Sequence, residues 1–182
     1  MTNQSAWENF DSGCFDVMRG DYRANHPSRS FIYNIIEKSF RKRPFQWLDV
    51  GLVGMVDYEH LVHKLNFVFT GVDISSSVIK DSEKYLCKDV DRLVLWNIED
   101  PVEKANSDLK SEFDLVTIRH VLNHCNYYEN PLDNIHSLLK DEGLCVVTLH
   151  LCLIEEDDRL NRGEFRDVPG EVISNYYNRQ RF

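Results

Sequence analysis

The sequence predicts one α/β domain, a doubly wound parallel sheet in three layers with helices on both faces. Short apolar runs that suit buried strands alternate with helix-like segments between residues 28 and 150. Such alternation is typical of repeated βαβ units with right-handed crossovers. The 182 residues, 42% of them hydrophobic and 12% aromatic, provide enough apolar material for a single packed core.

Five apolar runs rich in Val and Leu are expected to form the strands of this sheet. They are nearly continuous rather than alternating, as in strands buried on both faces of a parallel sheet. In chain order they are Phe45–Val50, Phe67–Val72, Arg92–Trp96, Phe113–Ile118 and Leu144–Leu149. The residues directly after the runs should therefore lie at one edge of the sheet, where open α/β sheets bind ligands.

The segments between the runs have the apolar spacing of helices. The expected helices are Ser30–Arg41, Val56–Leu65, Ser75–Leu86 and Pro131–Lys140. In the first of them the spacing places Phe31, Ile35 and Ile36 on the buried side. Three serines can cap the third helix, and a proline suits the first turn of the fourth.

Three regions follow from this pattern. Residues 1–27 are expected to be an N-terminal arm or lid, and residues 28–154 form the core. Residues 155–182 combine a charged loop with a helix around Glu171–Phe182. No internal repeat or Gly/Ser linker divides the core into smaller units.

The charge and the cysteines limit the partners and the location. The chain carries 21 Lys and Arg against 30 Asp and Glu, a net charge of −9, so it is not expected to bind bulk nucleic acid. The longest nearly apolar stretch, residues 144–154, is shorter than the roughly 20 residues of a membrane span. Five scattered cysteines without a CxxC pair indicate reduced thiols in a cytoplasmic protein.

Glycines and acids follow the first two runs, where a ligand is expected. Asp49 precedes a turn that contains Gly51 and Gly54. Glycines let the backbone approach a ligand closely, and the helix that follows points free N–H groups at it. Asp73 ends the second run, and a carboxylate there can accept both hydroxyls of a ribose. These residues predict a nucleotide-type cofactor site.

Polar residues also follow the third and fourth runs. Asn97 and Ile98 come after the third run, in a polar patch. Arg119, His120 and His124 come after the fourth. Since the runs are expected to be parallel, all of these residues should meet the glycine turn at the same edge of the sheet.

Taken together, these motifs resemble the class I S-adenosylmethionine-dependent methyltransferases, in particular the small-molecule branch known as type 11. The resemblance covers about residues 30–150 and implies a Rossmann-like fold. Its five motifs, in the family's order, fall on Leu48–Gly51, Gly71–Ser75, Asn97–Pro101, Phe113–His124 and Leu138–Gly143. It implies S-adenosylmethionine as cofactor, S-adenosylhomocysteine as product, and methyl transfer to an oxygen or nitrogen of a small-molecule or sugar-type acceptor.

The resemblance also implies roles for individual residues. The cofactor contacts would be Asp49, Gly51, Gly54, Asp73, Ile74, Asn97, Ile98 and Arg119. Candidates for the general base are His120, His124 and His150, and candidates for acceptor contacts are Tyr22, Tyr127 and Tyr128. Asn97 stands where the family has an acid, but its side-chain oxygen can still accept a hydrogen bond from adenine. No metal is expected, since the histidine pairs lack a supporting acid at HExxH spacing.

The sequence departs from the family in two places. Val53 and Met55 stand at glycine positions of the family's GxGxG turn. Only 32 residues follow residue 150, where the family has an antiparallel hairpin. Either the sheet is a minimal five-stranded version with the hairpin absent or truncated, or the chain is incomplete. An uncovered strand edge is prone to pairing, so a homodimer or a covering loop is expected.

Two alternative functions remain at this point. The first is a binding or scaffold module that has kept the fold and lost the activity. This function would explain why Val53 and Met55 stand at glycine positions of the family's turn. A nicotinamide-dependent dehydrogenase shares the architecture, but it requires the GxGxxG pattern, which the turn from Gly51 to Val56 does not contain.

Overall fold

The computed structural model describes residues 27–105, 109 and 112–148. It also places four two-residue strands beyond them, β6 (Leu151–Cys152), β7 (Phe165–Arg166), β8 (Ile173–Ser174) and β9 (Tyr177–Asn178). The expected N-terminal arm with Tyr22, and also His150, lie outside the described residues. β8 and β9 are extended where a C-terminal helix was expected.

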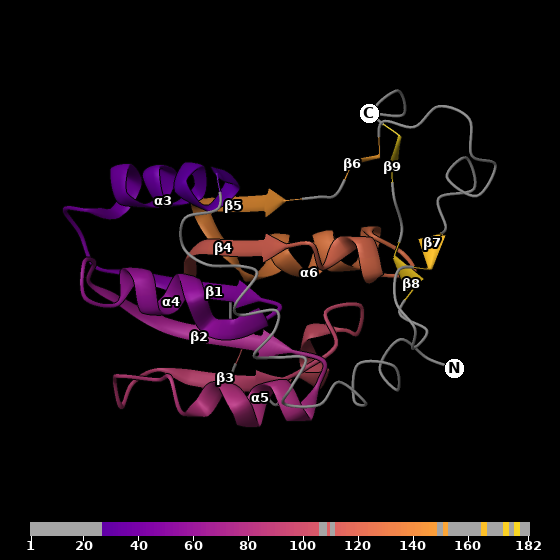
Figure 1. Cartoon of the computed structure of the whole chain (residues 1–182), viewed down its shortest axis with the longest axis horizontal. Helices are drawn as coiled ribbons and strands as arrows, with labels where there is room; N and C mark the ends of the chain where they lie inside the picture. Colours follow the sequence, from indigo (N-terminus) through magenta and orange to yellow (C-terminus); the bar gives the residue numbers. More distant parts are fainter. Residues whose placement is uncertain are drawn as a thin grey trace.

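Five parallel strands of the described chain form one sheet in the order β3-β2-β1-β4-β5 (Figure 1). Their bounds are β1 Phe45–Val50, β2 Phe67–Asp73, β3 Arg92–Leu95, β4 Phe113–Arg119 and β5 Leu139–Thr148. The strand order reverses between β1 and β4, which is the switch point of a doubly wound sheet. The predicted fold class is therefore confirmed. In the described part of the chain, no strand pairs with the outer edge of β5.

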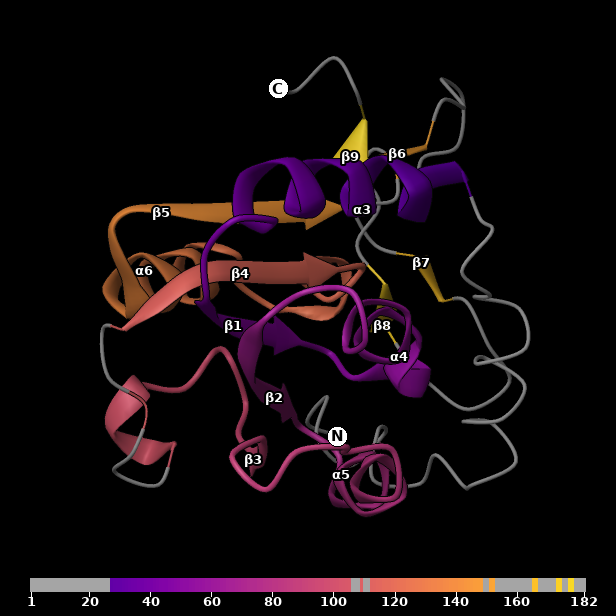
Figure 2. The same ribbon diagram turned by 90° about the vertical axis from the view of Figure 1, so that its left-hand side faces the viewer.

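Helices cover both faces of the sheet (Figure 2), and short 3₁₀ turns lie in the connections after β1, β3 and β4. The helices are α3 (Pro27–Phe40), α4 (Val56–Leu61), α5 (Ser76–Glu83) and α6 (Glu129–Leu138). The turns are η1 (Val53–Met55), η2 (Val102–Lys104) and η3 (Leu122–His124). None of the helices that the structure describes is long and apolar enough to cross a membrane.

Two buried clusters show which helix covers which face. Trp47 of β1 packs with α3, α4 and α5, whereas its neighbour Leu48 belongs to the cluster that contains Ile135 and Leu138 of α6. Successive residues of a strand point to opposite faces, so each strand supplies side chains to both cores. The result is the three-layer arrangement that the apolar runs predict.

The structure corrects several details of the predicted elements. Helix α3 buries Ile32 and Ile36, while Phe31, expected on the buried side, is 67% exposed. A rotation of the helix by one residue, about 100°, is enough to cause this difference. Strand β5 begins at Leu139, so the last two residues of the expected fourth helix, Leu139 and Lys140, are in the strand instead.

Candidate functional site

The carboxyl ends of β1, β2 and β4 bring the predicted cofactor residues to one edge of the sheet. In the strand register, Asp49 of β1 is paired with Gly71 of β2 and with Thr117 of β4. Gly51 follows β1, and Asp73 and Arg119 are the last residues of β2 and β4. The strands point toward the same side of the molecule, which places the predicted residues at the switch point (Figure 1).

The turn after β1 has the conformation that its glycines predict. Gly51 and Gly54 have φ angles of 85° and 78°, in the left-handed region that favours glycine. A Cβ atom on Gly51 would lie 2.4 Å from Cγ2 of Val121, so a side chain there would collide with the segment that follows β4. The Gly51 N–H donates to the Val72 carbonyl at 2.9 Å, which holds the turn against β2.

Met55 occupies one of the family's glycine positions and keeps a glycine-like backbone. Its φ of 51° is left-handed, a conformation that costs an L-residue roughly 1–2 kcal/mol. Its side chain is buried in the core that contains Tyr58 of α4 and Val78 of α5. The core therefore takes up the methionine side chain and offsets the backbone strain.

Asp73 joins the glycine turn to the start of α5. Its Oδ2 accepts from the Leu52 N–H and its Oδ1 from the Ser75 N–H, both at 2.9 Å. Burial raises the pKa of Asp73 from 3.8 to about 6, against the lowering effect of backbone hydrogen bonds from Ser75, Leu52 and Ile74. Each carboxylate oxygen has a second lone pair, so Asp73 can still accept hydrogen bonds from a ribose.

Asp49 is buried beneath this turn and joins a chain of side-chain hydrogen bonds. Trp47 Nε1–H donates to Thr117 Oγ1 at 2.8 Å, and the Thr117 hydroxyl donates to Asp49 Oδ1 at 2.5 Å. Burial raises the pKa of Asp49 from 3.8 to about 7, and Arg119 and Thr117 oppose the shift. The buried carboxyl of Asp49 is therefore easier to protonate than that of an exposed aspartate.

A buried ionic cluster centred on Asp57 of α4 lies next to Asp49, and sequence reasoning missed it. Asp57 Oδ1 accepts from Arg29 of α3 at 2.9 Å and from the Tyr33 hydroxyl at 2.6 Å. Asp57 Oδ2 forms an ion pair with Arg119. Burying these charges is favourable only when they are paired. No local signal singled out Asp57, because Glu59 and His60 lie in the same short helix and the partners of Asp57 depend on tertiary packing.

Arg119 was predicted to contact the cofactor, and the structure pairs it with Asp57 at the carboxyl end of β4. Its side chain is 12% exposed, and its Nε is buried without a hydrogen-bond partner among the described residues. The positive charge of Arg119 lowers the pKa of Asp49 and so opposes the increase that burial causes. The guanidinium thus has an ion pair with α4, and its Nε–H is available for an anionic group.

The loop after β3 holds Asn97 and Ile98 beside β2. The Trp96 N–H donates to the Asp73 carbonyl at 2.9 Å, and Asn97 Oδ1 accepts from the Glu99 N–H at 3.1 Å. Ile98 is buried. The Asn97 oxygen expected on adenine therefore already accepts one hydrogen bond, and its second lone pair remains for a ligand.

The histidines that follow β4 lie at the same edge. His120 has a left-handed φ of 57°, and its N–H donates to the Thr148 carbonyl of β5 at 3.0 Å. His124 ends η3, and both histidine side chains are half-buried. Strand β8 lies beside η3. Tyr127 and Tyr128 are 69% and 46% exposed, so they can contact a molecule from outside.

His60 of α4 has partners that indicate a structural role. The ring of His60 stacks on Tyr33 with centroids 4.1 Å apart, and its Nε2 lies 2.6 Å from Lys64 Nζ. Burial and the Lys64 charge lower the pKa of His60. In the part of the chain that the structure describes, no group of His, Cys, Asp and Glu could hold a metal ion.

The fold and the site define a class of protein. A doubly wound parallel sheet with a glycine turn after the first strand and an acid after the second is a nucleotide-cofactor domain. The sequence matches the methyltransferase domain family over residues 24–182. The chain therefore belongs to this family, the class I S-adenosylmethionine-dependent methyltransferases, whose cofactor is S-adenosylmethionine.

Solved structures share the fold at low sequence identity. A protein of Methanococcus maripaludis described as an S-adenosyl-L-methionine-dependent methyltransferase is 15% identical, with a TM-score of 0.60 over 78% of this chain and 65% of its own. A Haloferax volcanii methyltransferase in complex with the Trm112 activator is 13% identical, with a TM-score of 0.62 over 83% and 62%. A Rhodobacter sphaeroides protein described as a Zn-dependent alcohol dehydrogenase is 17% identical, with a TM-score of 0.63 over 88% and 60%.

These similarities concern the fold alone. The chain spans less than two thirds of the length of each of these structures. A search of curated proteins finds no match. The family match and the lack of a GxGxxG pattern separate this chain from the dehydrogenases. The fold alone does not separate them, because one fold can carry different functions.

Proposed function

We propose that the chain binds S-adenosylmethionine at the carboxyl edge of the sheet and transfers its methyl group to an oxygen or nitrogen of a small-molecule or sugar-type acceptor. The observation that carries this proposal is the hydrogen bond between Asp73 and the Leu52 N–H. It joins the acid after β2 to the glycine turn after β1, as a site for an adenosyl group requires.

The residues present fit the methyl donor. Asp73 has lone pairs for the ribose hydroxyls, and the left-handed glycines Gly51 and Gly54 shape the turn against which the donor would lie. The buried Nε–H of Arg119, which has no partner among the described residues, suits the carboxylate of the donor's amino-acid end. Asp49 beside it suits the ammonium group of that end.

The adenine side of the donor would lie along the loops after β2 and β3. Ile74 and Ile98 would provide apolar contacts, and Asn97 would bond the ring. The donor's sulfonium supplies an already activated methyl group, so the main task of the protein is to align the acceptor. Positioning of this kind can contribute about 7–11 kcal/mol to catalysis.

A general base is needed when the acceptor is a hydroxyl. His120 and His124 are the proposed bases, since both follow β4 at the edge where the methyl group would lie. His150 remains a third candidate. A general base contributes roughly 10²- to 10⁴-fold to the rate. Tyr127 and Tyr128, with Tyr22 of the N-terminal arm, are proposed to contact the acceptor.

A second candidate function is a cofactor-free binding module. The observations that favour it are Met55 at a glycine position and the pairing of Arg119 with Asp57. In either case, we propose a homodimer through the outer edge of β5, because in the described chain that edge has no neighbouring strand.

Calorimetric titration with S-adenosylmethionine and S-adenosylhomocysteine separates the two functions. Micromolar binding that Asp73→Asn weakens supports the enzyme, and absence of binding to both compounds supports the module. NAD serves as the competing ligand and is expected not to bind. Size-exclusion chromatography with light scattering tests the dimer.

The proposed bases are tested with a panel of acceptors and an assay for released S-adenosylhomocysteine. His120→Ala, His124→Ala and His150→Ala are compared with His136→Ala, which changes an exposed histidine of α6. One of the three changes should lower turnover at least about 100-fold without weakening donor binding. Full turnover in all three would contradict the assignment of the base.

A further inference from the structure

Two segments at the carboxyl edge, distant in sequence, are joined by one carboxylate. We call residues 97–101, after β3, the adenine-side loop, and residues 125–128, before α6, the tyrosine segment. Glu99 Oε1 accepts from the Asn126 N–H at 2.7 Å and from the Tyr127 N–H at 3.1 Å. Glu99 Oε2 accepts from Asn126 Nδ2 at 3.1 Å.

A second tie supports this connection from the other side. Asn134 of α6 donates through Nδ2 to the carbonyls of Ile98 and Asp100, at 2.7 and 2.8 Å. Asn97 Oδ1 in turn accepts from the Glu99 N–H, which fixes the backbone that carries the carboxylate. Hydrogen bonds thus hold both ends of the connection between the adenine-side loop and the tyrosine segment.

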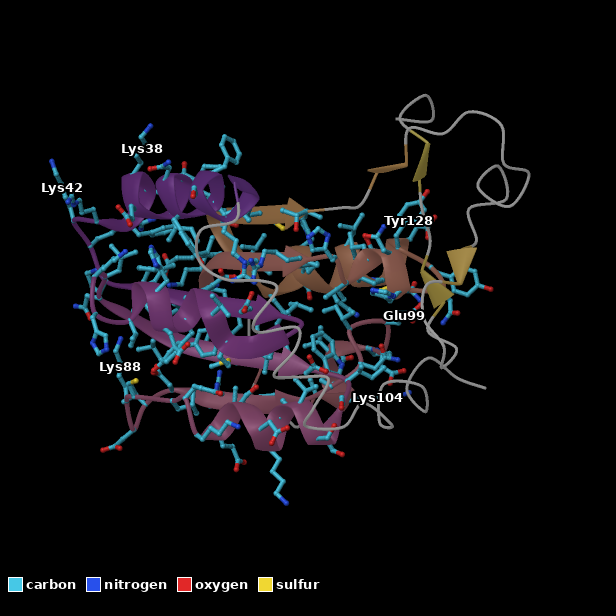
Figure 3. The ribbon with its side chains drawn as sticks, in the orientation of Figure 1. Lys38, Lys42, Lys88, Glu99, Lys104 and Tyr128 are labelled. Carbon is cyan, nitrogen blue, oxygen red and sulfur yellow. The ribbon has the colours of Figure 1, made fainter. Side chains whose placement is uncertain are left out.

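Glu99 lies at the same end of the molecule as the proposed site. Glu99 and Tyr128 lie at the end of the molecule toward which the strands point, while Lys42 and Lys88 lie at the opposite end (Figure 3). The bonds that Glu99 accepts are charge-assisted, which makes them stronger than bonds between neutral groups. They hold the backbone of Tyr127, whose side chain is 69% exposed.

We infer that Glu99 is a positioning residue that couples the two halves of the site: a donor bound against the adenine-side loop orders the tyrosine segment that receives the acceptor. The inference rests on the proposed function, because it requires the donor's adenosyl group at that loop. Coupling between sites is reciprocal, so an acceptor held by the tyrosine segment tightens donor binding by the same factor. The acceptor site is thereby best formed when the methyl donor is present.

A purely structural role for Glu99 would give a different result. A fixed support of α6 protects the tyrosine segment equally with and without a donor. A coupling residue changes the protection of that segment when the donor binds. The difference between the free and the bound state is therefore the quantity to measure.

The experiment is amide hydrogen exchange of residues 125–128 in the full chain, with and without saturating S-adenosylhomocysteine. Glu99→Gln keeps the shape and one acceptor oxygen but removes the charge. Asn126→Ala removes only the donor to Oε2 and leaves both backbone bonds. Glu103→Gln is the matched control, since Glu103 is an exposed acid of the neighbouring turn η2. Calorimetry on each variant reports whether the ligand binds.

In the wild type and in Glu103→Gln, S-adenosylhomocysteine should slow amide exchange at Asn126 and Tyr127 by about tenfold. A factor of this size is expected when hydrogen bonds to a charged group become stronger. Glu99→Gln should still bind the ligand but lose this slowing, and Asn126→Ala should retain part of it. Binding with equal slowing in Glu99→Gln, or with none in the wild type, overturns the coupling alone. Absence of binding in the wild type overturns the proposed function and the coupling with it.

Discussion

The carboxyl groups at the two edges of the sheet have pKa values that are shifted in opposite directions. At the amino edge, Asp114 accepts from the Gln46 N–H and from Lys140 Nζ, both at 2.9 Å, and Arg43 lies nearby. The pKa of Asp114 is lowered, because these partners outweigh the effect of partial burial. At the carboxyl edge, the pKa values of Asp49 and Asp73 are raised to about 7 and about 6, in both cases by burial.

This difference separates structural acids from candidate functional ones. Asp114 is satisfied by the protein itself, and its ionised form stabilises the fold. Asp49 and Asp73 are ionised at a cost, because the protein alone does not fully compensate their burial. Groups whose pKa is shifted in this way gather at functional sites, since a ligand can supply the missing interactions.

The largest expected effect comes from Asp57, the centre of the ionic cluster at the carboxyl edge. Asp57→Ala leaves Arg29 and Arg119 without their shared partner in a buried site. Removing one partner of a buried pair costs roughly 3–5 kcal/mol, so the free energy of unfolding should fall by that amount. Urea unfolding measures it, and Asp114→Ala is the comparison at the amino edge. Equal losses for the two variants would remove the distinction between the edges.

The next effect concerns ligand binding at the same edge. Asp73→Asn removes a charged acceptor for the ribose and weakens the tie to the Leu52 N–H. Hydrogen bonds to charged groups contribute about 1.5–3 kcal/mol, so affinity for S-adenosylhomocysteine should fall about 10- to 100-fold. Calorimetry measures this change, with Asp114→Asn as the control that keeps wild-type affinity. An unchanged affinity in Asp73→Asn would exclude Asp73 from the cofactor site.

The pH dependence of stability should have opposite signs for the two edges. The folded pKa values of Asp49 and Asp73 lie above 3.8, so the folded chain holds protons that the unfolded chain has released. Their contribution to stability is therefore present at low pH and is lost as pH rises from about 4 to about 7. Asp114, with its lowered pKa, contributes stability above its ordinary value and loses it as pH falls.

Urea unfolding over this pH range tests the sign. Asp49→Asn should flatten the decrease in stability between about pH 4 and about pH 7, whereas Asp114→Asn should leave it in place. A wild-type stability that rises steadily through this range would show that Asp49 and Asp73 are compensated in the free protein. The comparison between the edges would then fail.

The smallest effect is expected at the amino edge. Lys140 pairs with Asp114 at 2.9 Å, but its side chain is 42% exposed. Exposed ion pairs contribute roughly 0.2–1 kcal/mol, so Lys140→Ala should lower the free energy of unfolding by no more than that. The loss should shrink in high salt, where surface charges are screened. A loss of unfolding free energy as large as that of Asp57→Ala would contradict the view that the ion pair of Asp114 with Lys140 is a weak surface interaction.

The amino-acid sequence by itself determines the five strands, their parallel arrangement and the edge at which Asp49, Asp73 and Arg119 meet. Nearly continuous apolar runs suit strands covered on both faces, and parallel strands place their carboxyl ends together. The glycine turn is likewise readable, because left-handed backbone at Gly51 and Gly54 favours glycine.

Tertiary structure alone decided the ionic cluster of Asp57, the tie between Glu99 and the tyrosine segment, and the buried face of α3. Arg29 and Asp57 are 28 residues apart, and Glu99 and Asn126 are 27 apart. Local patterns carry no information about such pairs, since their distance depends on how separate helices and loops pack on the sheet. A rotation of α3 by one residue, about 100°, exchanges Phe31 for Ile32 in the core, and the packing against β1 and α4 selects between them.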